Sequence, residues 1–592
     1  MKELRSHLIN CLINFFKENY ETKITQKEIN ISITRDEFEG DLTLIVFPLV
    51  KFSKDDLFIT SNKIGNYILS KVPYIVNYNI IKGFLNVVIS DKYLVQSFLS
   101  IISIEEYSFV KINNKTQPVV IEFCSPNTNK PLHLGHIRNN LLGFSISNIL
   151  KATGNKVERV QIINDRGIHI CKSMAAWILY SNGETPKSSF TKGDHFVGKY
   201  YVLFEKTYNQ EVKKLILSGK SENDARNSAP IMLKAKDILI KWEKKDPNII
   251  SLWKKMNNWV YQGFNQTHNR LGISFDKNYY ESDTYLHGKK YINEGINKNI
   301  FYKKNDGSVW VNLKKEGLDE KILLRSDGTS VYITQDIGTA ILRKIDFNFE
   351  KMIYVVGNEQ DYHFKVLFMI LKKLKMSWSS KCYHLSYGMV DLPNGKMKSR
   401  EGTTVDADNL MDDMVLNSKE LSKKIKDDID VRDENQNKYE IIGLAALKYF
   451  ILKVDPKKRI LFNPNESIDF NGNTGPFIQY TYVRILALKR KKFKITNIND
   501  NYKLIKKEKK LIKLIFEYPN ILIDASENLN PSILANYLYK LVKEYNHFYQ
   551  NVSIFKSKLS DQISFRLILS IKVSDVIKSG MKILGINLPE KM

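Results

Sequence analysis

The spacing of apolar residues over the first 112 positions predicts a small domain of mixed helix and strand. An amphipathic helix at the N-terminus is followed by strand-like runs at Leu42–Phe47 and Ile80–Ile89. Gly83 interrupts the second run at a position typical of a turn. The polar stretch Asn113–Pro118 then predicts a linker to the next part of the chain.

From residue 113 to about residue 455, short apolar runs alternate with helical spacing. Three runs predict strands: Val157–Ile163, Met352–Val356 and Cys382–Met389. Helical stretches such as Phe364–Leu374 follow them, so we expect a parallel sheet with crossover helices, a Rossmann-like α/β domain. Ligands of such sheets bind beyond the carboxyl ends of the strands. Between roughly residues 170 and 310 the chain is more helical and rich in lysine, which predicts an insertion that covers the sheet.

The last part of the chain, from about residue 456 to residue 592, is helical in pattern almost throughout. Four stretches carry apolar residues at spacings of three and four: Phe477–Leu488, Leu511–Leu522, Ser532–Phe548 and Phe565–Leu584. This pattern predicts an all-α helix bundle. The basic run Lys489–Lys513 is either a solvated face or, with aromatic residues nearby, a surface that binds RNA.

Between Val119 and Gly143 the chain changes from strand to loop to helix. Val119–Phe123 predicts a buried strand, and Pro126, Asn127, Asn129 and Pro131 belong to a loop before a helix that is expected from about Leu132. A helix N-terminus after such a loop favours anions, because its backbone N–H groups have no partner within the helix. His133 and His136 lie one turn apart on this first turn, and Gly135 lets a flat base approach the backbone. Ordinary helix histidines, or two ligands of a metal site, are the alternatives.

A second basic cluster lies between Gly395 and Gly402. Lys396, Lys398 and Arg400 are bounded there by glycines. Such a cationic loop can neutralise the charge that develops on a triphosphate. Taken alone it is more typical of an exposed basic loop.

Length and composition narrow the function classes. A chain of 592 residues is too long for one core, and its hydrophobic content of 43% is ordinary for a globular protein. The formal net charge of +26 indicates either a lysine-rich composition or a polyanionic partner such as RNA. The four cysteines are scattered without a CxxC pair, which argues against a zinc ribbon and a disulfide framework. There is no P-loop motif, no GxGxxG motif after a strand, no membrane-length apolar window and no signal peptide, so we expect a cytoplasmic protein with no membrane partner.

The two basic motifs together resemble the class I aminoacyl-tRNA synthetases, and within them the arginyl-tRNA synthetase family. His133-Leu-Gly-His136 is similar to the HIGH signature, and Lys396-Met-Lys-Ser-Arg400 is an imperfect match to the KMSKS loop, with Ser399 in place of its second lysine. In arginyl enzymes a lysine just before the HIGH signature supplies the missing charge, and Lys130 stands there. The resemblance implies a HUP-type catalytic domain over residues 113–455, an N-terminal domain over residues 1–112 that touches the outer corner of tRNA, and an anticodon-binding domain over residues 456–592.

The resemblance also implies site residues, because several segments of this chain match segments that form the site in the family. For catalysis the resemblance implies Lys130, His133, His136, Lys396, Lys398, Ser399 and Arg400. For ATP it implies Pro126, Asn129, Lys130, His133, Gly135, His136, Gly357, His363, Met389, Val390 and Met397. For arginine it implies Glu122, Asn127, Tyr332, Asp336 and Gln360. For tRNA we expect Gln479, Tyr480, Tyr545 and Tyr549.

The choice of arginine has support from the residues themselves. Tyr332 and Asp336 are four positions apart, so on a helix they share a face, and a carboxylate is the group that a guanidinium prefers. An ordinary surface pair is the alternative. Glu122 ends a strand expected to be buried, where an unpaired carboxylate is costly. Either a cationic ligand, or Lys130 or Arg138, would satisfy it.

The resemblance implies a two-step reaction. Arginine attacks the α-phosphorus of ATP, which carries Mg²⁺, and the arginyl group then passes to the terminal ribose of the tRNA. No metal site formed by the protein, no zinc and no tightly bound cofactor is expected. A monomer that needs tRNA before it forms the adenylate is the family-based expectation. The alternatives are an RNA-binding descendant that has lost catalysis, a small HxGH nucleotidylyltransferase, and a synthetase for another amino acid such as cysteine.

Overall fold

The computed structural model describes the chain in ten stretches. These are residues 2–35, 37–103, 108–112, 116–391, 405–425, 436–469, 471–491, 493–499, 502–557 and 559–592. The predicted phosphate-binding residues from Lys396 to Arg400 lie outside them. Contacts within the chain define two compact units. One comprises residues 1–108, 481–521 and 540–578, and the other comprises residues 109–480, 522–539 and 579–592. The domain boundaries expected at residues 112 and 455 stay predictions.

The N-terminal part of the first unit is a four-stranded antiparallel sheet with helices. Its strand order is β1-β2-β4-β3. The elements are α1 (Lys2–Tyr20), β1 (Ile31–Ile33), β2 (Leu42–Ile45), α2 (Val50–Ser53), α3 (Leu57–Lys71), β3 (Ile75–Ile81), β4 (Phe84–Ile89) and α4 (Asp91–Ser100). The run predicted over Ile80–Ile89 is divided, because Lys82 and Gly83 adopt positive φ angles of 46° and 79° and turn the chain from β3 into β4. The expected mixture of helix and strand is present.

A five-stranded parallel sheet forms the centre of the second unit, as the alternation of apolar runs predicted. Its order is β12-β11-β5-β6-β7, and every neighbouring pair is parallel. The strands are β5 (Val119–Glu122), β6 (Val157–Ile163), β7 (Lys277–Tyr280), β11 (Lys351–Gly357) and β12 (Cys382–Tyr387). The chain proceeds from β5 through β6 to β7 and only later adds β11 on the other side of β5. The sheet therefore has its switch point between β5 and β11, where ligands of such folds bind.

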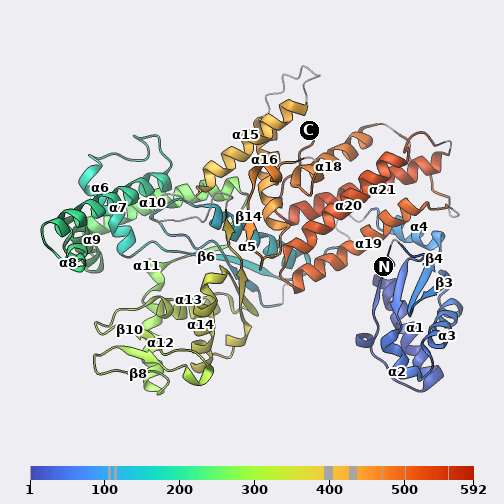
Figure 1. Ribbon diagram of the computed structural model, residues 1–592, viewed down its shortest axis with the longest axis horizontal. Helices are drawn as coiled ribbons and strands as arrows, with labels where there is room; N and C mark the ends of the chain where they lie inside the picture. The colour runs from blue at the N-terminus through green and yellow to red at the C-terminus, as the bar shows by residue number, and fades with distance from the viewer. Residues whose placement is uncertain are drawn as a thin grey trace. The chain divides into compact units, whose positions relative to one another are not determined.

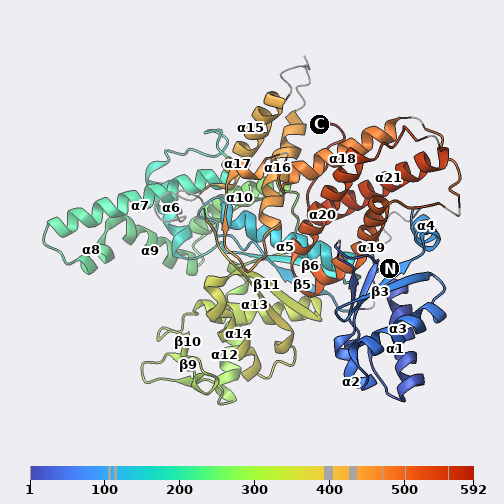
Figure 2. The same cartoon turned by 45° about the vertical axis from the view of Figure 1, so that its right-hand side comes forward.

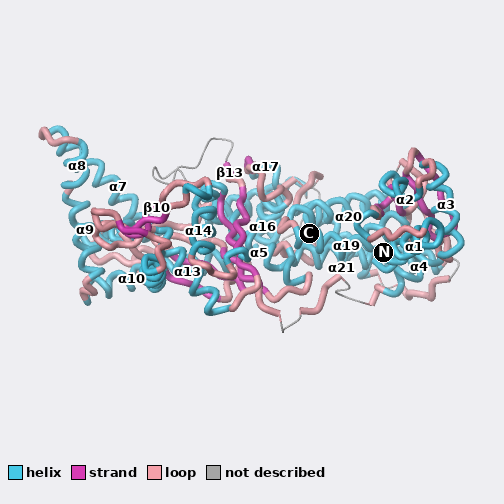
Figure 3. The backbone as a smooth tube through the Cα atoms, turned by 90° about the horizontal axis from the view of Figure 1, so that it is seen from below, coloured by secondary structure: helices cyan, strands magenta, loops and turns pink. Residues whose placement is uncertain are grey.

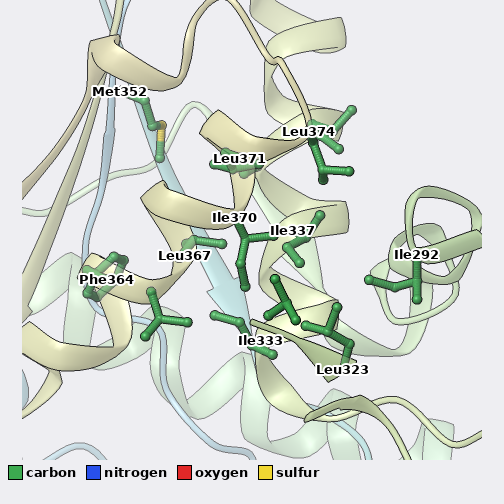
Figure 4. Close-up of a cluster of buried hydrophobic side chains, with 14 of the residues drawn as sticks. Ile292, Leu323, Ile333, Ile337, Met352, Phe364, Leu367, Ile370, Leu371 and Leu374 are labelled. Carbon is green, nitrogen blue, oxygen red and sulfur yellow. The ribbon is translucent and has the colours of Figure 1, made fainter. Parts of the chain in front are cut away.

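Helix α5 (Leu134–Ala152) packs on this sheet and contacts β5, β6 and β11 (Figure 2). Helices α13 (Tyr332–Phe347) and α14 (Asp361–Lys373) enclose a hydrophobic core with β11. Figure 4 shows Leu367 and Ile370 of α14 turned toward Ile333 and Ile337 of α13. Phe364 instead stacks on the ring of His384 in β12, with ring centres 4.3 Å apart. This core fixes the start of α13 relative to the end of β11.

The segment predicted as a helical insertion is helical over most of its length but also contains strands. Five helices follow β6: α6 (Ile168–Tyr180), α7 (Gly193–Leu217), α8 (Glu222–Ser228), α9 (Pro230–Glu243) and α10 (Pro247–Arg270). Figure 1 labels all of them, and Figure 3 shows α7 to α10 from another side. The prediction is wrong at Lys277–Tyr280, where β7 joins the central sheet, and again from Tyr302, where a separate antiparallel sheet begins. Two further short helices, α11 (Glu281–Thr284) and α12 (His287–Asn297), lie between these strands. The antiparallel sheet comprises β8 (Tyr302–Lys303), β9 (Val309–Val311) and β10 (Lys321–Leu324). These strands have two to four residues, which is too short for a period to show in the sequence.

The remainder of the described chain is mostly helical. Its elements are β13 (Val390–Asp391), α15 (Ala407–Ile425), α16 (Gln436–Leu452), β14 (Ile460–Leu461), α17 (Pro464–Ser467), α18 (Gly475–Arg490), α19 (Lys506–Glu527), α20 (Pro531–Asn551) and α21 (Ser560–Ile583). The four helices predicted after residue 456 correspond to α18 to α21. Among the helices described, none has both the length and the apolar content that crossing a bilayer requires.

Candidate active site

The loop after β5 carries several predicted site residues and has an unusual backbone. Cys124 and Ser125 have φ angles of 73° and 49°, a region that side chains other than glycine rarely adopt. Asn139 of α5 holds this loop: its side-chain oxygen accepts a hydrogen bond from the Cys124 N–H. Its amide nitrogen donates to the Val355 carbonyl (2.8 Å) and to the Tyr387 hydroxyl (3.0 Å). One buried amide therefore ties together the carboxyl ends of β5, β11 and β12.

The helix that carries the two histidines begins two residues later than the sequence predicted. Leu134 is its first residue, and His133 is the N-cap with an extended backbone. The Gly135 N–H donates to Nδ1 of His133 (3.1 Å), and the His133 N–H donates to Nδ1 of His136 (3.2 Å). The pair forms a capping box, which satisfies two backbone donors of the first turn. Residues 133–136 are called the histidine turn below.

These hydrogen bonds set the protonation of both rings. Because each Nδ1 accepts a hydrogen bond, a neutral ring must carry its proton on Nε2. Burial, together with the positive charge of Lys130, lowers the pKa of His133 to about 4. Burial also lowers the pKa of His136 well below its ordinary value, with further contributions from His133 and Lys130. At neutral pH the turn therefore offers two uncharged Nε2–H donors at a helix N-terminus. An anion there gains hydrogen bonds without a histidine having to be charged.

Lys130 supplies the positive charge beside this turn. Its side chain is half-buried, and burial lowers its pKa. Lys130 lines a cavity of about 880 Å³. The cavity also contacts Asn127, Asn129 and Tyr332, so four predicted residues for arginine or ATP share one space.

Several lining residues of this cavity were not predicted from the sequence. They include Asn164, Arg166, Glu281, Lys289, Arg325 and Gln335. The pKa of Glu281 is raised to about 7, mainly by burial and also by the nearby carboxylates of Asp165 and Asp336, while Arg166 opposes the rise. Glu281 directly follows β7, so it lies at the carboxyl end of a strand of the central sheet. Recognising β7 in the sequence would have identified it.

The predicted nucleotide residues at the ends of β11 and β12 lie close together. A Cβ atom on Gly357 would lie 3.5 Å from Sδ of Met389. The Met389 carbonyl accepts a hydrogen bond from Arg138 (3.0 Å). Val390 is 2% exposed, within the short strand β13, so its side chain serves packing and only its backbone remains a candidate contact. The Pro126 carbonyl accepts from the Asn164 N–H (2.9 Å), which joins the loop after β5 to the end of β6.

The predicted arginine residues have different surroundings. Asp336 contacts Nε2 of His363 (2.6 Å), which brings together a residue predicted for arginine and one predicted for ATP. Gln360 and Tyr332 are exposed, and Tyr332 is the first residue of α13. Glu122, in contrast, is 7% exposed and forms an ion pair with Arg343.

The partner of Glu122 corrects an expectation. Neither Lys130, Arg138 nor an open site satisfies this carboxylate, because Arg343 of α13 already binds one oxygen and the Ser125 hydroxyl donates to the other (3.1 Å). Arg138 instead donates to the carbonyls of Met389, Pro456 and Lys458. Each of the two buried arginines thus has a structural task.

Two of the residues predicted to touch tRNA are buried. Gln479 and Tyr545 are both 0% exposed, and the amide of Gln479 donates to the Asn587 carbonyl (2.8 Å). Their side chains therefore serve packing in this structure. Tyr480 is 45% exposed, and Tyr549 is half-buried beneath the Arg484 guanidinium, 5.0 Å from its ring centre.

Comparison with known proteins decides between the interpretations that the sequence left open. The family model "tRNA synthetases class I (R), catalytic domain" matches residues 99–463, and the model "DALR anticodon binding domain" matches residues 478–592. The chain belongs to the class I arginyl-tRNA synthetases. The arginine–tRNA ligase of Flavobacterium psychrophilum is 52% identical over 582 residues, which cover 96% of this chain and 97% of the relative. The arginine–tRNA ligase of Bacteroides thetaiotaomicron is 50% identical over 596 residues, and 100% of each chain is covered.

Solved arginyl-tRNA synthetases share the fold at low identity. The Thermus thermophilus enzyme has a TM-score of 0.76 at 19% identity, with 100% of both chains covered. The Plasmodium falciparum enzyme has a TM-score of 0.76 at 20% identity, with 99% of both covered. The predictions of the family, of an α/β parallel-sheet core with a helical C-terminal domain, and of a ligase that joins arginine to its tRNA are therefore confirmed. ATP, arginine and tRNA are the substrates of this reaction. The alternatives are set aside: an RNA-binding descendant without catalysis, a small nucleotidylyltransferase, and a synthetase for another amino acid.

Proposed function

We propose that, in arginine activation, the histidine turn binds ATP and the cavity binds arginine. In this proposal the turn and Lys130 hold the phosphates of ATP, while Gly357, Met389 and the backbone of Val390 border its adenosine. The observation that supports this division is the pair of neutral Nε2–H donors at the N-terminus of α5, beside the half-buried Lys130. Donors fixed in advance at a helix N-terminus stabilise negative charge without reorganisation.

Arginine is proposed to occupy the cavity with its guanidinium near Asp336. Asn127 and Tyr332 line that cavity, and Gln360 follows β11 at the adjacent strand end. The carboxylate of Asp336, already in contact with His363, offers the charge-assisted hydrogen bonds that a guanidinium prefers. Glu122 is left out of these contacts, because Arg343 binds its carboxylate. Glu122 acts instead by fixing the loop through Ser125.

The reaction has two steps, formation of the arginyl adenylate and transfer of arginine to tRNA, and the protein promotes them by positioning the substrates and stabilising charge. The carboxylate of arginine attacks the α-phosphorus of ATP, the bond to the β-phosphate breaks, and pyrophosphate leaves with the Mg²⁺ that accompanies ATP. The Nε2–H groups of His133 and His136 and the ammonium of Lys130 stabilise the developing phosphate charge. By the family resemblance, Lys396, Lys398, Ser399 and Arg400 also stabilise this charge, and Met397 of the same segment contacts ATP. A terminal ribose hydroxyl of the tRNA attacks the arginyl carbonyl in the second step, and AMP leaves.

For tRNA we retain two of the predicted aromatic residues. Tyr480 and Tyr549 keep exposed or partly exposed rings, and α18 ends in the basic residues Lys489 and Arg490. Stacking on such rings and attraction of phosphate to lysine and arginine are the usual means of holding RNA.

We further propose a cytoplasmic monomer that has no zinc or metal site of its own and that needs bound tRNA to form the adenylate at full rate.

The proposal is tested at His133. His133→Ala should reduce ATP–pyrophosphate exchange and aminoacylation by about 100-fold or more, because removal of one oxyanion-type donor costs about that much. Binding of the cognate tRNA, measured by filter retention, should change little. His133→Asn keeps an acceptable N-cap, so it separates helix stability from donation to phosphate, and it should also be slow. His287→Ala, at an exposed histidine of α12, is the matched control. Full exchange activity in both His133 variants would refute the assignment.

A further inference from the structure

A cluster of charged and polar side chains lies beside the histidine turn and is not part of the proposed substrate contacts. It joins helices α7 and α10 of the insertion to the start of α15. Its members are Lys192, Asp194, His195, Thr267, Asp406 and Asp408, called the Lys192 cluster here. All six belong to the same compact unit as the cavity.

Lys192 is the centre of the cluster. Its ammonium lies 2.5 Å from a carboxylate oxygen of Asp408, 3.1 Å from Asp194 and 2.5 Å from the Thr267 hydroxyl. Thr267 also donates to Asp408 (3.1 Å). The Lys192 side chain is only 18% exposed and that of Asp194 is 0% exposed. A buried carboxylate without a cation is costly, so Lys192 is what allows the two acids to stay in this place.

His195 adds a second contact to the same acids. Its Nε2 lies 3.2 Å from Asp408 and 3.3 Å from Asp406. Burial opposes ionisation of Asp408, but hydrogen bonds from His195 and Lys192 outweigh it and lower the pKa of Asp408 to about 2. Asp408 is therefore a charged anchor at neutral pH.

The oxygen and nitrogen atoms of this cluster could also be taken for a metal site. Ligand atoms of Asp194, His195 and Asp408 lie within 4.8 Å of one another. However, the Lys192 ammonium contacts both carboxylates directly, in the place where a divalent cation would bind. A second cation there would face the repulsion of this charge. The cluster is therefore an internal ion network.

The acids of the cluster are connected to the histidine turn through the backbone. Leu134 donates its N–H to the Val405 carbonyl (3.0 Å), and Ala407 donates to the Leu132 carbonyl (3.0 Å). His133 and Asp406 form an isolated antiparallel bridge between these two bonds. The backbone of His133 is thus held on both sides by the segment that the cluster anchors.

Asp406 also begins the helix that follows. Its side chain accepts hydrogen bonds from the N–H groups of Asp408 (2.9 Å) and Asn409 (3.0 Å), so it caps α15. The N-termini of α5 and α15 meet at this bridge. A shift of Asp408 would therefore move the start of α15 and, through the bridge, the histidine turn.

We propose that Lys192 is a positioning residue for arginine activation: by binding Asp408 and Asp194 it fixes residues 405–407 against residues 132–134 and so sets the place of the His133 and His136 donors. The proposal rests on the function proposed above for the histidine turn. Lys192 touches no substrate in it. The helical insertion, through the lysine at the N-cap of α7 and one threonine of α10, thereby controls the geometry of the phosphate site.

The test replaces Lys192 and its partner singly and together. Lys192→Met should lower kcat of ATP–pyrophosphate exchange, measured with tRNA present, by about 10- to 100-fold, since a misplacement near 1 Å costs about that much. The KM for arginine and the Kd for tRNA should stay within about twofold, because neither ligand touches the cluster in this proposal. Asp408→Asn should have a similar effect, and the double variant should be no slower than the slower single variant, because both remove the same contact.

Two further variants distinguish positioning from a general loss of structure. Lys192→Arg keeps the charge and should recover most of kcat. Lys199→Met removes an ion-paired lysine within α7, bound to Glu184 at 3.1 Å but exposed, and should leave kcat unchanged. Normal kcat in Lys192→Met, additive losses in the double variant, or a loss in Lys192→Met that matches its loss of folded protein by circular dichroism would each overturn the proposal. If His133→Ala and His133→Asn both keep full exchange activity, the proposed function of the histidine turn fails, whatever the Lys192 variants show.

Discussion

The pair formed by Arg343 and Glu122 makes a quantitative prediction about what Glu122 does. Arg343 is 1% exposed and Glu122 is 7% exposed, so their ion pair is fully inside the protein. The Arg343 guanidinium also lies over the rings of Tyr279 and Tyr354, with centres at 5.2 Å and 5.7 Å. Arg343→Met keeps most of the side-chain volume and removes the charge. Among the residues that the structure describes, Glu122 would then retain only the Ser125 hydroxyl as a hydrogen-bond donor.

The loss of stability expected in Arg343→Met follows from the burial of this ion pair. Removing one partner of a buried ion pair leaves an uncompensated charge and costs about 3–5 kcal/mol. Arg343→Met should therefore lower the free energy of unfolding by about that amount. Glu122→Gln combined with Arg343→Met removes both charges and should recover much of the loss. Arg226→Met, at an exposed ion pair with Glu222 in α8, is the control and should have little effect.

The assay combines stability with substrate use. Thermal unfolding, followed by circular dichroism at a single protein concentration, ranks the stability of the variants. The KM for arginine in ATP–pyrophosphate exchange with tRNA present then reports on the site. If Glu122 is only the structural partner of Arg343, the folded double variant keeps its arginine KM within about threefold, as expected for a loss below 1 kcal/mol. A stable double variant whose arginine KM rises tenfold or more would refute the reasoning, because Glu122 would then touch the substrate.

Three further predictions concern the site itself. Lys130→Ala should slow adenylate formation by about 10- to 100-fold, the value of one charge-assisted hydrogen bond, with little change in arginine or tRNA affinity; a selective loss of tRNA affinity would make Lys130 an RNA contact. Glu281 lines the cavity proposed for arginine, and its pKa, raised to about 7 mainly by burial, makes it neutral below that pH and negatively charged above it. The added negative charge should attract the guanidinium, so the arginine KM should fall severalfold between pH 6 and pH 8, and Glu281→Gln should flatten this profile; the same pH profile in wild type and Glu281→Gln would contradict this role. Asn139→Ala releases the loop after β5 from the ends of β11 and β12, so it should lower kcat of pyrophosphate exchange by about 10- to 100-fold. Arginine and a non-hydrolysable ATP analogue should each still bind alone; equal losses of both affinities would indicate general unfolding.

The sequence predicted the parts of the fold in which pattern and burial coincide. Val157–Ile163 is fully recovered as β6, because its apolar residues lie between two neighbouring strands of a parallel sheet. Strand β7 was missed, because Lys277–Tyr280 pairs on one side only and leaves its first two residues exposed. An edge strand of this kind has no continuous apolar run for a pattern to detect.

The sequence likewise identified only some of the residues of the candidate site. His133 and His136 could be selected from the sequence, because their spacing and the preceding loop are local features. The partner of Glu122 could not, since Arg343 comes from a helix that is distant in the chain and reaches Glu122 only in the folded state. Gln479 and Tyr545 were predicted at an RNA surface, but helical spacing alone does not show which amphipathic side chains face inward.

The roles proposed for Asp336 and the cavity require that this site activates arginine and no other amino acid. A direct experiment supplies total tRNA and each labelled amino acid in turn to the wild-type enzyme and to Asp336→Ala. The wild type should charge tRNA with arginine alone, and Asp336→Ala should lose arginine use by at least 100-fold while an ATP analogue still binds. Charging with a different amino acid, or an unchanged arginine KM in Asp336→Ala, would contradict these roles.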